Sequence, residues 1–171
     1  MLRALISKKL DAEERRLGVP LDYLRQILRA SLGSFFTFTK IMPIAQHRKV
    51  LPPEPYYVAR MVATRDEDCG TCLQIEVNLA TEAAVGREVL RAVLDRAPER
   101  LPAELAEVYR FAEGVVTASG EEDGLRPAIV ERWGERGLVE LAMAIAAARF
   151  FPITKRTLGH ATSCRLVEIR L

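Results

Sequence analysis

The residues with the most evident chemistry are two cysteines three positions apart, in the segment Cys69-Gly-Thr-Cys72. Residues three apart on a helix share a face, so the two sulfurs can meet and bond with little backbone change. The positive end of a helix stabilises an anion, and the thiolate is the reactive form of cysteine. A neighbouring thiol can then trap an oxidised sulfur as a disulfide. The spacing therefore predicts a dithiol redox couple at a helix start.

Glu76 lies four residues after Cys72 and seven after Cys69, on the same helical stripe. A carboxylate in that place can relay protons to the thiols. Because an ionised carboxylate raises the pKa of a neighbouring thiol, the relay requires that Glu76 is protonated, shares a proton through water, or is countered by Arg60 or Arg65. The competing interpretation of Glu76 is a solvated or arginine-paired carboxylate.

Three other uses of the cysteine pair stay open. The pair can be packed in a core without chemistry. It can supply two of the four ligands of a zinc ion, for which His47, His160 and Cys164 are the remaining candidates. It can belong to a thioredoxin-like domain, which requires a strand before the first cysteine and a βαβ pattern, neither of which the sequence shows. His160 can also fold back as a base, or be a surface histidine, and Cys164 is expected to be a small buried or tail residue.

Composition indicates a single folded domain over residues 1–171, with 49% hydrophobic and 28% charged residues. The balance of 25 Lys and Arg against 23 Asp and Glu leaves no basic field for a nucleic-acid partner. The longest uninterrupted apolar run, residues 141–148, is too short to cross a bilayer, and the N-terminus lacks the apolar centre of a signal peptide. Three cysteines do not make a secreted disulfide framework. We therefore expect a cytoplasmic protein with no membrane and no nucleic-acid partner.

The abundance of Ala and Leu, with few aromatic residues, predicts an all-α fold. Helices are expected over residues 21–32, 35–46, 56–64, 69–85, 89–94, 105–117, 127–135 and 138–151. The segment 51–55 is expected to be a stiff proline connection, 119–124 a polar loop, and the acids at 66–68 a cap for the cysteine helix.

The helix expected over residues 138–151 is apolar nearly all round, which predicts either a central core helix or a subunit contact. Gly137 is expected to end the helix before it, and Pro152 to stop this one. The tail from 164 to 171 fits either a short strand or a helix end.

Two stretches resemble the carboxymuconolactone decarboxylase and alkylhydroperoxidase-D (AhpD) superfamily. The first is Arg60 to Thr64 followed by Asp68-Cys-Gly-Thr-Cys-Leu-Gln-Ile-Glu76, and the second, residues 107–145, resembles the family's later helices in order and spacing. The resemblance covers residues 50–155. It implies an AhpD-like helical bundle that assembles as trimers or multiples of trimers, with thiol chemistry that uses no cofactor. The chain then divides into a helical extension (1–50), a core (51–155) and a tail (156–171).

The resemblance also implies residue roles. Cys72 attacks the peroxide and Cys69 resolves the product as a disulfide, whereas the helix dipole alone favours Cys69 as the more acidic thiol. The sequence departs from the family at two places: Glu76 stands where the family has histidine, and the family's upstream glutamate falls on Tyr57, with Glu54 nearby. The sequence carries no nucleotide or flavin signature, so an external thiol reductant is needed to recycle the pair.

The expected function is that of a thiol/disulfide oxidoreductase with alkylhydroperoxide reductase activity. Cys72 is the expected nucleophile, Cys69 the resolving thiol and Glu76 the proton-transfer group, acting on a peroxide or disulfide substrate. One alternative is a non-catalytic, redox-responsive helical oligomer. Another is lactone decarboxylation, an activity whose family members do not use the cysteine pair.

Overall fold

The computed structural model describes residues 2–164 and 167–171. Within them the protein has nine α-helices, one 3₁₀ turn and no strand, so the all-α prediction is confirmed. The elements are α1 (Leu2–Leu17), α2 (Asp22–Ala30), α3 (Leu32–Thr39), α4 (Met42–Ala45), α5 (Pro53–Asp66), α6 (Gly70–Glu82), α7 (Arg87–Leu94), η1 (Pro98–Arg100), α8 (Ala103–Thr117) and α9 (Glu121–Thr157). The expectation of a strand or helix end over 164–171 falls partly on residues 165 and 166, which lie outside the described residues.

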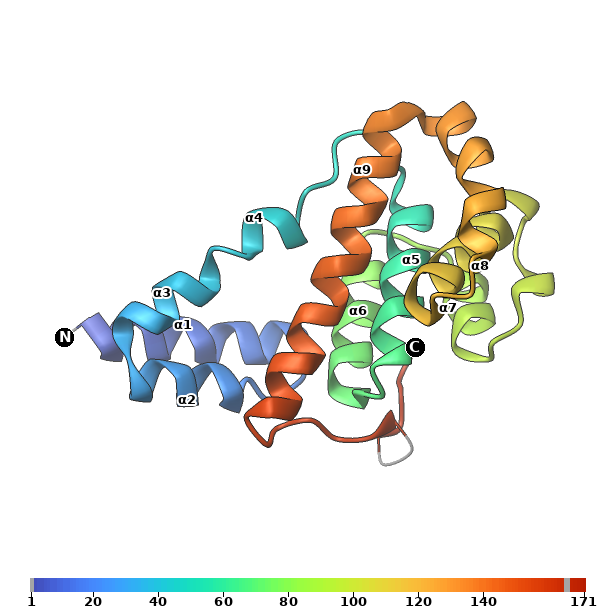
Figure 1. Ribbon diagram of the computed structural model, residues 1–171. Coiled ribbons are helices and arrows are strands. Elements are labelled where there is room, and N and C mark those ends of the chain that lie inside the picture. Colours follow the sequence, from blue (N-terminus) through green and yellow to red (C-terminus); the bar gives the residue numbers. More distant parts are fainter. Residues whose placement is uncertain (1, 165–166) are drawn as a thin grey trace.

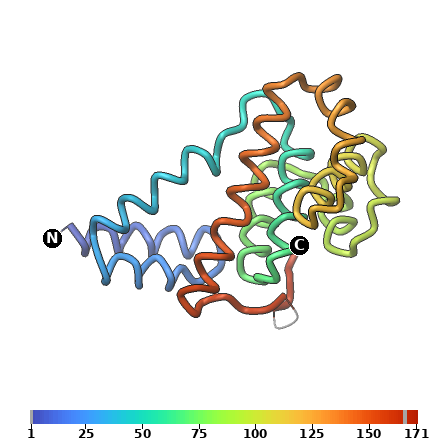
Figure 2. Tube along the Cα trace, viewed as in Figure 1, coloured from blue at the N-terminus to red at the C-terminus, as the bar shows by residue number. Residues whose placement is uncertain are grey.

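The lower part of α9 lies between two groups of helices (Figure 1). Helices α1–α4 lie on one side of it, and α5 and α6 lie on the other. The main hydrophobic core is formed by residues between Leu51 and Ala148. A second cluster packs α1–α3 against Ile75 and Leu79 of α6 and against Leu158, just after α9. The tail then runs back to the start of α6, next to the cysteine pair (Figure 2).

The predicted helix boundaries near Gly137 are wrong, because the break lies at Gly134. Gly134 has φ of 69° and ψ of 177°, a backbone conformation that residues with a Cβ rarely adopt. Gly137 is helical, and a Cβ there would lie 2.3 Å from the Cβ of Trp133. Its lack of a side chain therefore serves packing across the kink. The predicted polar loop at 119–124 is also shorter than expected, since α9 begins at Glu121.

Pro152 does not stop α9, which continues to Thr157. Proline lacks the N–H that would bond to the carbonyl of residue 148. The hydroxyl of Thr64, on α5, donates to this Ala148 carbonyl at 3.5 Å. A neighbouring helix thus supplies a donor for the carbonyl that Pro152 cannot reach, and the last turn of α9 carries Lys155 to the cysteine pair.

The proline segment 51–55 is only partly a connection, because α5 begins at Pro53. Prolines in the first turn of a helix are tolerated because the N–H groups there have no intrahelical partner. Just before this turn, the buried carboxylate of Glu140 accepts the backbone N–H groups of Lys49, Val50 and Leu51 at 2.8–3.0 Å. Glu140 therefore fixes the chain where the N-terminal helices join the core.

The apolar part of α9 packs against α5 and α8, yet it is not covered on all sides. Val139, Phe150 and Ile153 are 53%, 36% and 49% exposed. Helix α9 is also long and apolar enough, by length and composition, to cross a membrane; its apolar window is 44% buried inside the protein, and core helices pass the same test. The single chain therefore leaves an apolar stripe of α9 open.

Candidate functional site

The structure places the two sulfurs side by side at the start of α6. Cys69 is the N-cap residue of this helix and Cys72 lies in its first turn. Their Sγ atoms are 2.7 Å apart, and both cysteines are free thiols. A movement of less than about 1 Å brings them to the 2.03–2.05 Å of a disulfide bond. The backbone is therefore already arranged for the pair to open and close.

The acids at 66–68 do not cap α6, contrary to the prediction. Glu67 instead accepts hydrogen bonds from Arg149 and Arg156, which join the end of α5 to the end of α9. Asp68 has φ of 47° and accepts the backbone N–H of Cys164 at 2.8 Å. The acids thus hold α9 and the tail around the cysteine helix, and the N-cap position is left to Cys69 itself.

The two thiols have opposite pKa shifts. The hydrogen bond between the sulfurs is the largest influence on both: the pKa of Cys69 is lowered to about 5, and the pKa of Cys72 is raised well above its usual value. The Thr71 hydroxyl, the backbone N–H of Cys72 and the charge of Lys155 also lower the pKa of Cys69, while burial opposes them. The first proton therefore leaves Cys69 and the second stays on Cys72, as the helix dipole predicts.

Lys155 is the residue of this site that sequence reasoning missed. Its side chain is 2% exposed, its ammonium lies over the ring of Tyr23 at 5.2 Å, and its Nζ donates to Thr71 Oγ1 at 3.0 Å. The same Thr71 oxygen lies 3.7 Å from the Sγ of Cys69. No spacing signal could have found Lys155, because it comes from α9 and reaches the site only through the helical turn beyond Pro152.

Glu76 is paired with Arg60. The guanidinium of Arg60 donates through Nε and Nη2 to the two carboxylate oxygens of Glu76, at 2.7 and 2.6 Å, and both side chains are buried. Of the two candidate counter-ions, Arg60 therefore takes this place, while Arg65 donates to Tyr109 and to the Val93 carbonyl. Among the described residues, no hydrogen bond joins Glu76 to either sulfur.

A cavity of about 160 Å³ lies between the N-terminal helices and the core. Cys72 and Glu76 line it and Cys69 does not. Most of its other walls are apolar, from α1, α2, α4, α6 and α9: Leu17, Leu21, Leu24, Met42, Ala45, Ile75, Leu79, Ala148, Phe151 and Pro152. A small molecule in this cavity therefore meets the sulfur of Cys72 and the charged groups of Glu76, Arg60 and Lys155, in otherwise apolar surroundings.

The C-terminal tail covers the Cys69 side of the pair. The N–H of Gly70 donates to the Thr162 carbonyl at 2.8 Å. A Cβ on Gly70 would lie 2.6 Å from the Cβ of Val167 and 3.2 Å from the Cα of Cys164. The motif therefore needs glycine at this position because the tail packs directly on it. Cys69 itself is fully buried as a result.

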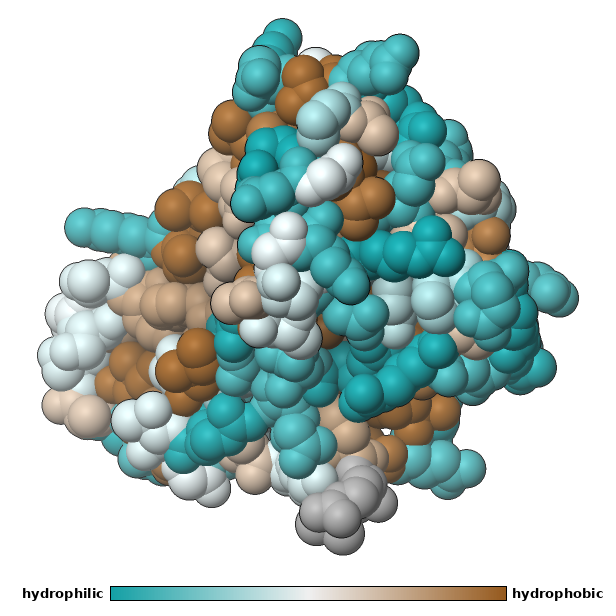
Figure 3. Space-filling view, turned by 45° about the vertical axis from the view of Figure 1, so that its right-hand side comes forward, coloured by the Kyte–Doolittle hydropathy of each residue, from teal (hydrophilic) through white to brown (hydrophobic). Residues whose placement is uncertain are grey.

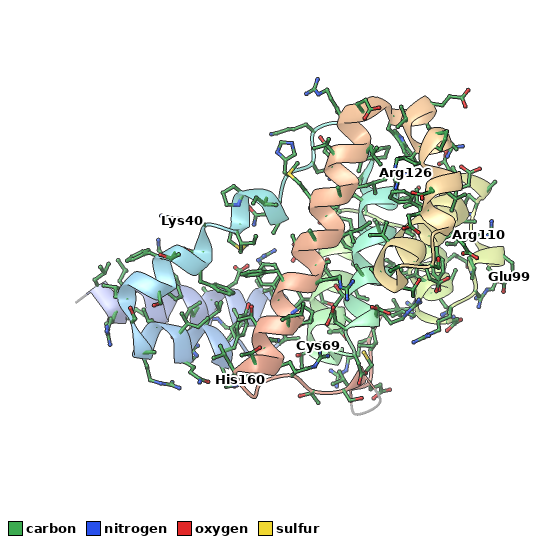
Figure 4. The ribbon with its side chains drawn as sticks, viewed as in Figure 1. Lys40, Cys69, Glu99, Arg110, Arg126 and His160 are labelled. Atoms are coloured by element: carbon green, nitrogen blue, oxygen red, sulfur yellow. The ribbon has the colours of Figure 1, made fainter. Side chains whose placement is uncertain are left out.

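The other candidate residues lie nearby without joining the pair. Cys164 is half-buried in the tail, and burial, with the neighbouring Asp68, raises its pKa to about 11. The imidazole of His160 contacts Gln26, and Figure 4 shows His160 at the turn after α9, away from Cys69. Within the described part of the chain, no three His, Cys, Asp or Glu side chains are arranged to hold a metal ion.

Comparisons with known proteins found no match for this chain among family models, curated proteins or solved structures.

Proposed function

We propose that the protein is a thiol/disulfide oxidoreductase with an AhpD-like fold, which reduces a peroxide or a disulfide through Cys72 and Cys69. The observation that carries the proposal is the 2.7 Å separation of the two sulfurs at a helix start, with Cys72 on the wall of a cavity. A substrate in the cavity can reach Cys72 but not Cys69, which does not line the cavity, so Cys72 is the proposed attacking sulfur. The order of the helices and the Cys69-Gly-Thr-Cys72 motif support the family resemblance.

In the peroxide reaction, the Cys72 proton passes to the Cys69 thiolate across the 2.7 Å contact between the sulfurs. The Cys72 thiolate then attacks one oxygen of ROOH and the O–O bond breaks. Cys72 becomes a sulfenic acid, and the leaving RO⁻ takes the proton from Cys69 to become ROH, which restores the Cys69 thiolate. The Cys69 thiolate then attacks the Cys72 sulfur, forms the disulfide and releases hydroxide, which takes a proton to become water. Because Cys69 is the more acidic thiol, it is already in the form that this second step needs.

In the disulfide reaction, Cys72 gives its proton to the Cys69 thiolate and then attacks one sulfur of RSSR, so that a mixed disulfide forms. The leaving RS⁻ takes the proton from Cys69 to become RSH, which restores the Cys69 thiolate. The Cys69 thiolate then attacks the Cys72 sulfur and displaces the second RS⁻. Either reaction leaves a Cys69–Cys72 disulfide, which an external dithiol reduces by transferring two electrons and two protons. The chain needs no bound cofactor for these steps.

Glu76 is proposed to exchange protons with the substrate or with water in the cavity. Support comes from its place on the cavity wall beside Cys72. Arg60 neutralises the charge that would otherwise oppose a thiolate there. The sequence alone does not distinguish Arg60 from Arg65 as the residue that neutralises Glu76.

Assembly as a trimer or a multiple of trimers is part of the proposal. The apolar residues Val139, Phe150 and Ile153 of α9 are exposed in the single chain, and so are Phe36, Met42 and Ile44 near α3 and α4. Apolar residues also gather on the left of the face in Figure 3. Contiguous exposed apolar surface is typical of contact sites. Light scattering on the native protein and on Val139→Asp tests this, since the assembly formed by the variant is expected to have a lower mass than the native assembly.

The second candidate function is a redox-responsive oligomer without catalysis. Two observations favour it: both cysteines are at most 5% exposed, and Glu76 forms its ion pair with Arg60 and not with a thiol. Stopped-flow mixing of the reduced protein with an alkyl hydroperoxide separates the two functions. Rapid thiol loss that disappears in Cys72→Ser supports the enzyme, and equal rates in Cys72→Ser and the native protein would exclude it.

A further inference from the structure

Within the described residues, the charged side chains that line the cavity are paired, with one exception. Arg60 binds Glu76, and Arg16 binds Glu13, each through a direct ion pair. Lys155 lines the same cavity and is 2% exposed, yet no carboxylate lies within 4 Å of it among the described residues. An isolated buried ammonium is strongly unfavourable unless an anion or a set of acceptors compensates it.

The acceptor that Lys155 does have leads to the dithiol. Its ammonium donates to the Thr71 oxygen at 3.0 Å, and this oxygen lies 3.7 Å from the Cys69 sulfur. A threonine hydroxyl has one proton and two lone pairs. With one lone pair occupied by the ammonium, the hydroxyl proton is free to point at Cys69. The contacts therefore run from the cation through Thr71 to the sulfur.

We propose that Lys155, acting through the Thr71 hydroxyl, is the positioning residue that holds the negative charge of the reduced dithiol on Cys69. The thiolate is then the missing counter-ion of the buried ammonium, and each charge compensates the burial of the other. The inference deepens the proposed function and rests on it, because it explains how Cys69 keeps the thiolate that accepts the Cys72 proton and later closes the disulfide, while Glu76 is occupied by Arg60.

Other groups facing Lys155 do not offer the same compensation. Tyr23 presents its ring, and burial raises the pKa of its hydroxyl, so it contributes no anion near neutral pH. Asp22 and His160 line a second cavity with Lys155 and Thr71, but no ion pair joins either of them to the ammonium within the described residues. The Cys72 thiol carries the remaining proton of the pair. Cys69 is left as the site of the negative charge.

Titration of thiolate absorbance at 240 nm in the reduced protein tests the proposal without any oxidant, with a Cys69→Ser/Cys72→Ser variant as the blank. The native midpoint is expected well below the ordinary ~8.5 of cysteine. Lys155→Met is expected to raise it by about one to three pH units, the usual effect of one close opposite charge. Lys155→Arg is expected to keep it low, and Lys40→Met, far from the dithiol (Figure 4), to leave it unchanged.

A midpoint in Lys155→Met equal to that of the native protein would overturn the proposal. If that variant does not fold, Thr71→Val decides, because it keeps the shape of the residue and removes the hydroxyl. A raised midpoint in Thr71→Val supports the assignment, and an unchanged one refutes it. A native dithiol that has the low midpoint but never reacts with peroxide or disulfide would refute the proposed function alone, so the two failures are distinguishable.

Discussion

The guanidinium of Arg60 binds both carboxylate oxygens of Glu76, at 2.7 and 2.6 Å, inside the protein. Arg60 also donates to the carbonyl of Ala45 at 2.9 Å, which the Tyr56 hydroxyl approaches at 2.7 Å. One arginine therefore connects α5 and α6 with the end of α4, on the wall of the cavity. The carboxylate that the sequence suggests for proton transfer is thus also part of the structure that closes the cavity.

The first prediction separates these two roles of Glu76. Glu76→Gln leaves the Arg60 charge without its partner, so the free energy of unfolding is expected to fall by about 3 kcal/mol, as is usual for one broken buried pair. Replacing both residues, in Arg60→Met/Glu76→Met, is expected to recover much of that loss in urea unfolding. If Glu76 transfers protons, peroxide is expected to oxidise the dithiol of both variants more slowly than that of the native protein. A double variant that is oxidised as fast as the native protein would show that Glu76 is only structural.

The second prediction concerns Glu140 and acid stability. Burial alone would raise the pKa of Glu140, but the N–H groups of Leu51, Val50 and Lys49 outweigh it and the pKa is lowered. Because the pKa of Glu140 is lower in the folded protein than in the unfolded chain (~4.3), its ionised carboxylate contributes its full stability above pH ~4.3. That contribution is lost as the pH falls through the pKa of the folded protein. The free energy of unfolding at pH 7 is expected to be about 1–3 kcal/mol lower in Glu140→Gln than in the native protein. Equal urea midpoints for variant and native protein at pH 7 would contradict this role.

The third prediction concerns the tail over the pair. Gly70→Ala places a methyl group 2.6 Å from the Cβ of Val167, so the tail has to move and Cys69 becomes accessible. Alkylation of Cys69, measured by mass spectrometry, is expected to be faster than in the native protein. Gly124→Ala is the control, since no atom lies within 4 Å of a Cβ at that position. Unchanged Cys69 alkylation in Gly70→Ala would mean that the tail does not cover the thiol.

The fourth prediction is a pH dependence of stability in the reduced protein. The pKa of Cys69 is about 5 in the folded protein and near ~8.5 in the unfolded chain. The Cys69 thiolate is therefore expected to contribute fully to the free energy of unfolding above pH ~8.5, and this contribution is lost as the pH falls towards 5. Urea unfolding of the reduced protein relative to Cys69→Ser is expected to show a difference that grows from pH 5 to pH 8. A constant difference would mean that Cys69 is not acidic in the fold.

The parts of this architecture that the sequence predicts are those that local spacing decides. The composition in Ala and Leu predicts an all-α chain, and a spacing of three places Cys69 and Cys72 on one face of a helix. Both depend on neighbours within a single helix. The place of Cys69 at the helix start also favours it as the more acidic thiol, although the hydrogen bond with Cys72 is the largest cause of its lowered pKa.

The parts that the sequence does not predict depend on contacts between distant elements. Pro152 predicts the end of a helix, whereas in the structure the Thr64 hydroxyl of another helix donates to the Ala148 carbonyl. Lys155 follows from that continuation, so it could not be foreseen. The choice of Arg60 over Arg65 as the partner of Glu76 likewise depends on how α5 packs against α6.

The position of the break in α9 is a further example. Gly134 and Gly137 are similar candidates in the sequence, since each has one charged neighbour: Glu135 follows Gly134 and Arg136 precedes Gly137. Only Gly134 takes the left-handed conformation, whereas Gly137 is glycine because Trp133 packs against it. Glycine can serve either backbone or packing, and composition does not distinguish the two uses.

The central claim is that Cys69 and Cys72 interconvert between two thiols and one disulfide. The most direct measurement treats the reduced protein with one equivalent of an alkyl hydroperoxide, alkylates the remaining thiols and analyses the peptides by mass spectrometry. We predict that the peptide holding Cys69 and Cys72 loses two hydrogen atoms and escapes alkylation, while Cys164 is alkylated. A peptide in which both cysteines are still alkylated, or in which Cys72 is overoxidised without a bond to Cys69, would contradict the claim.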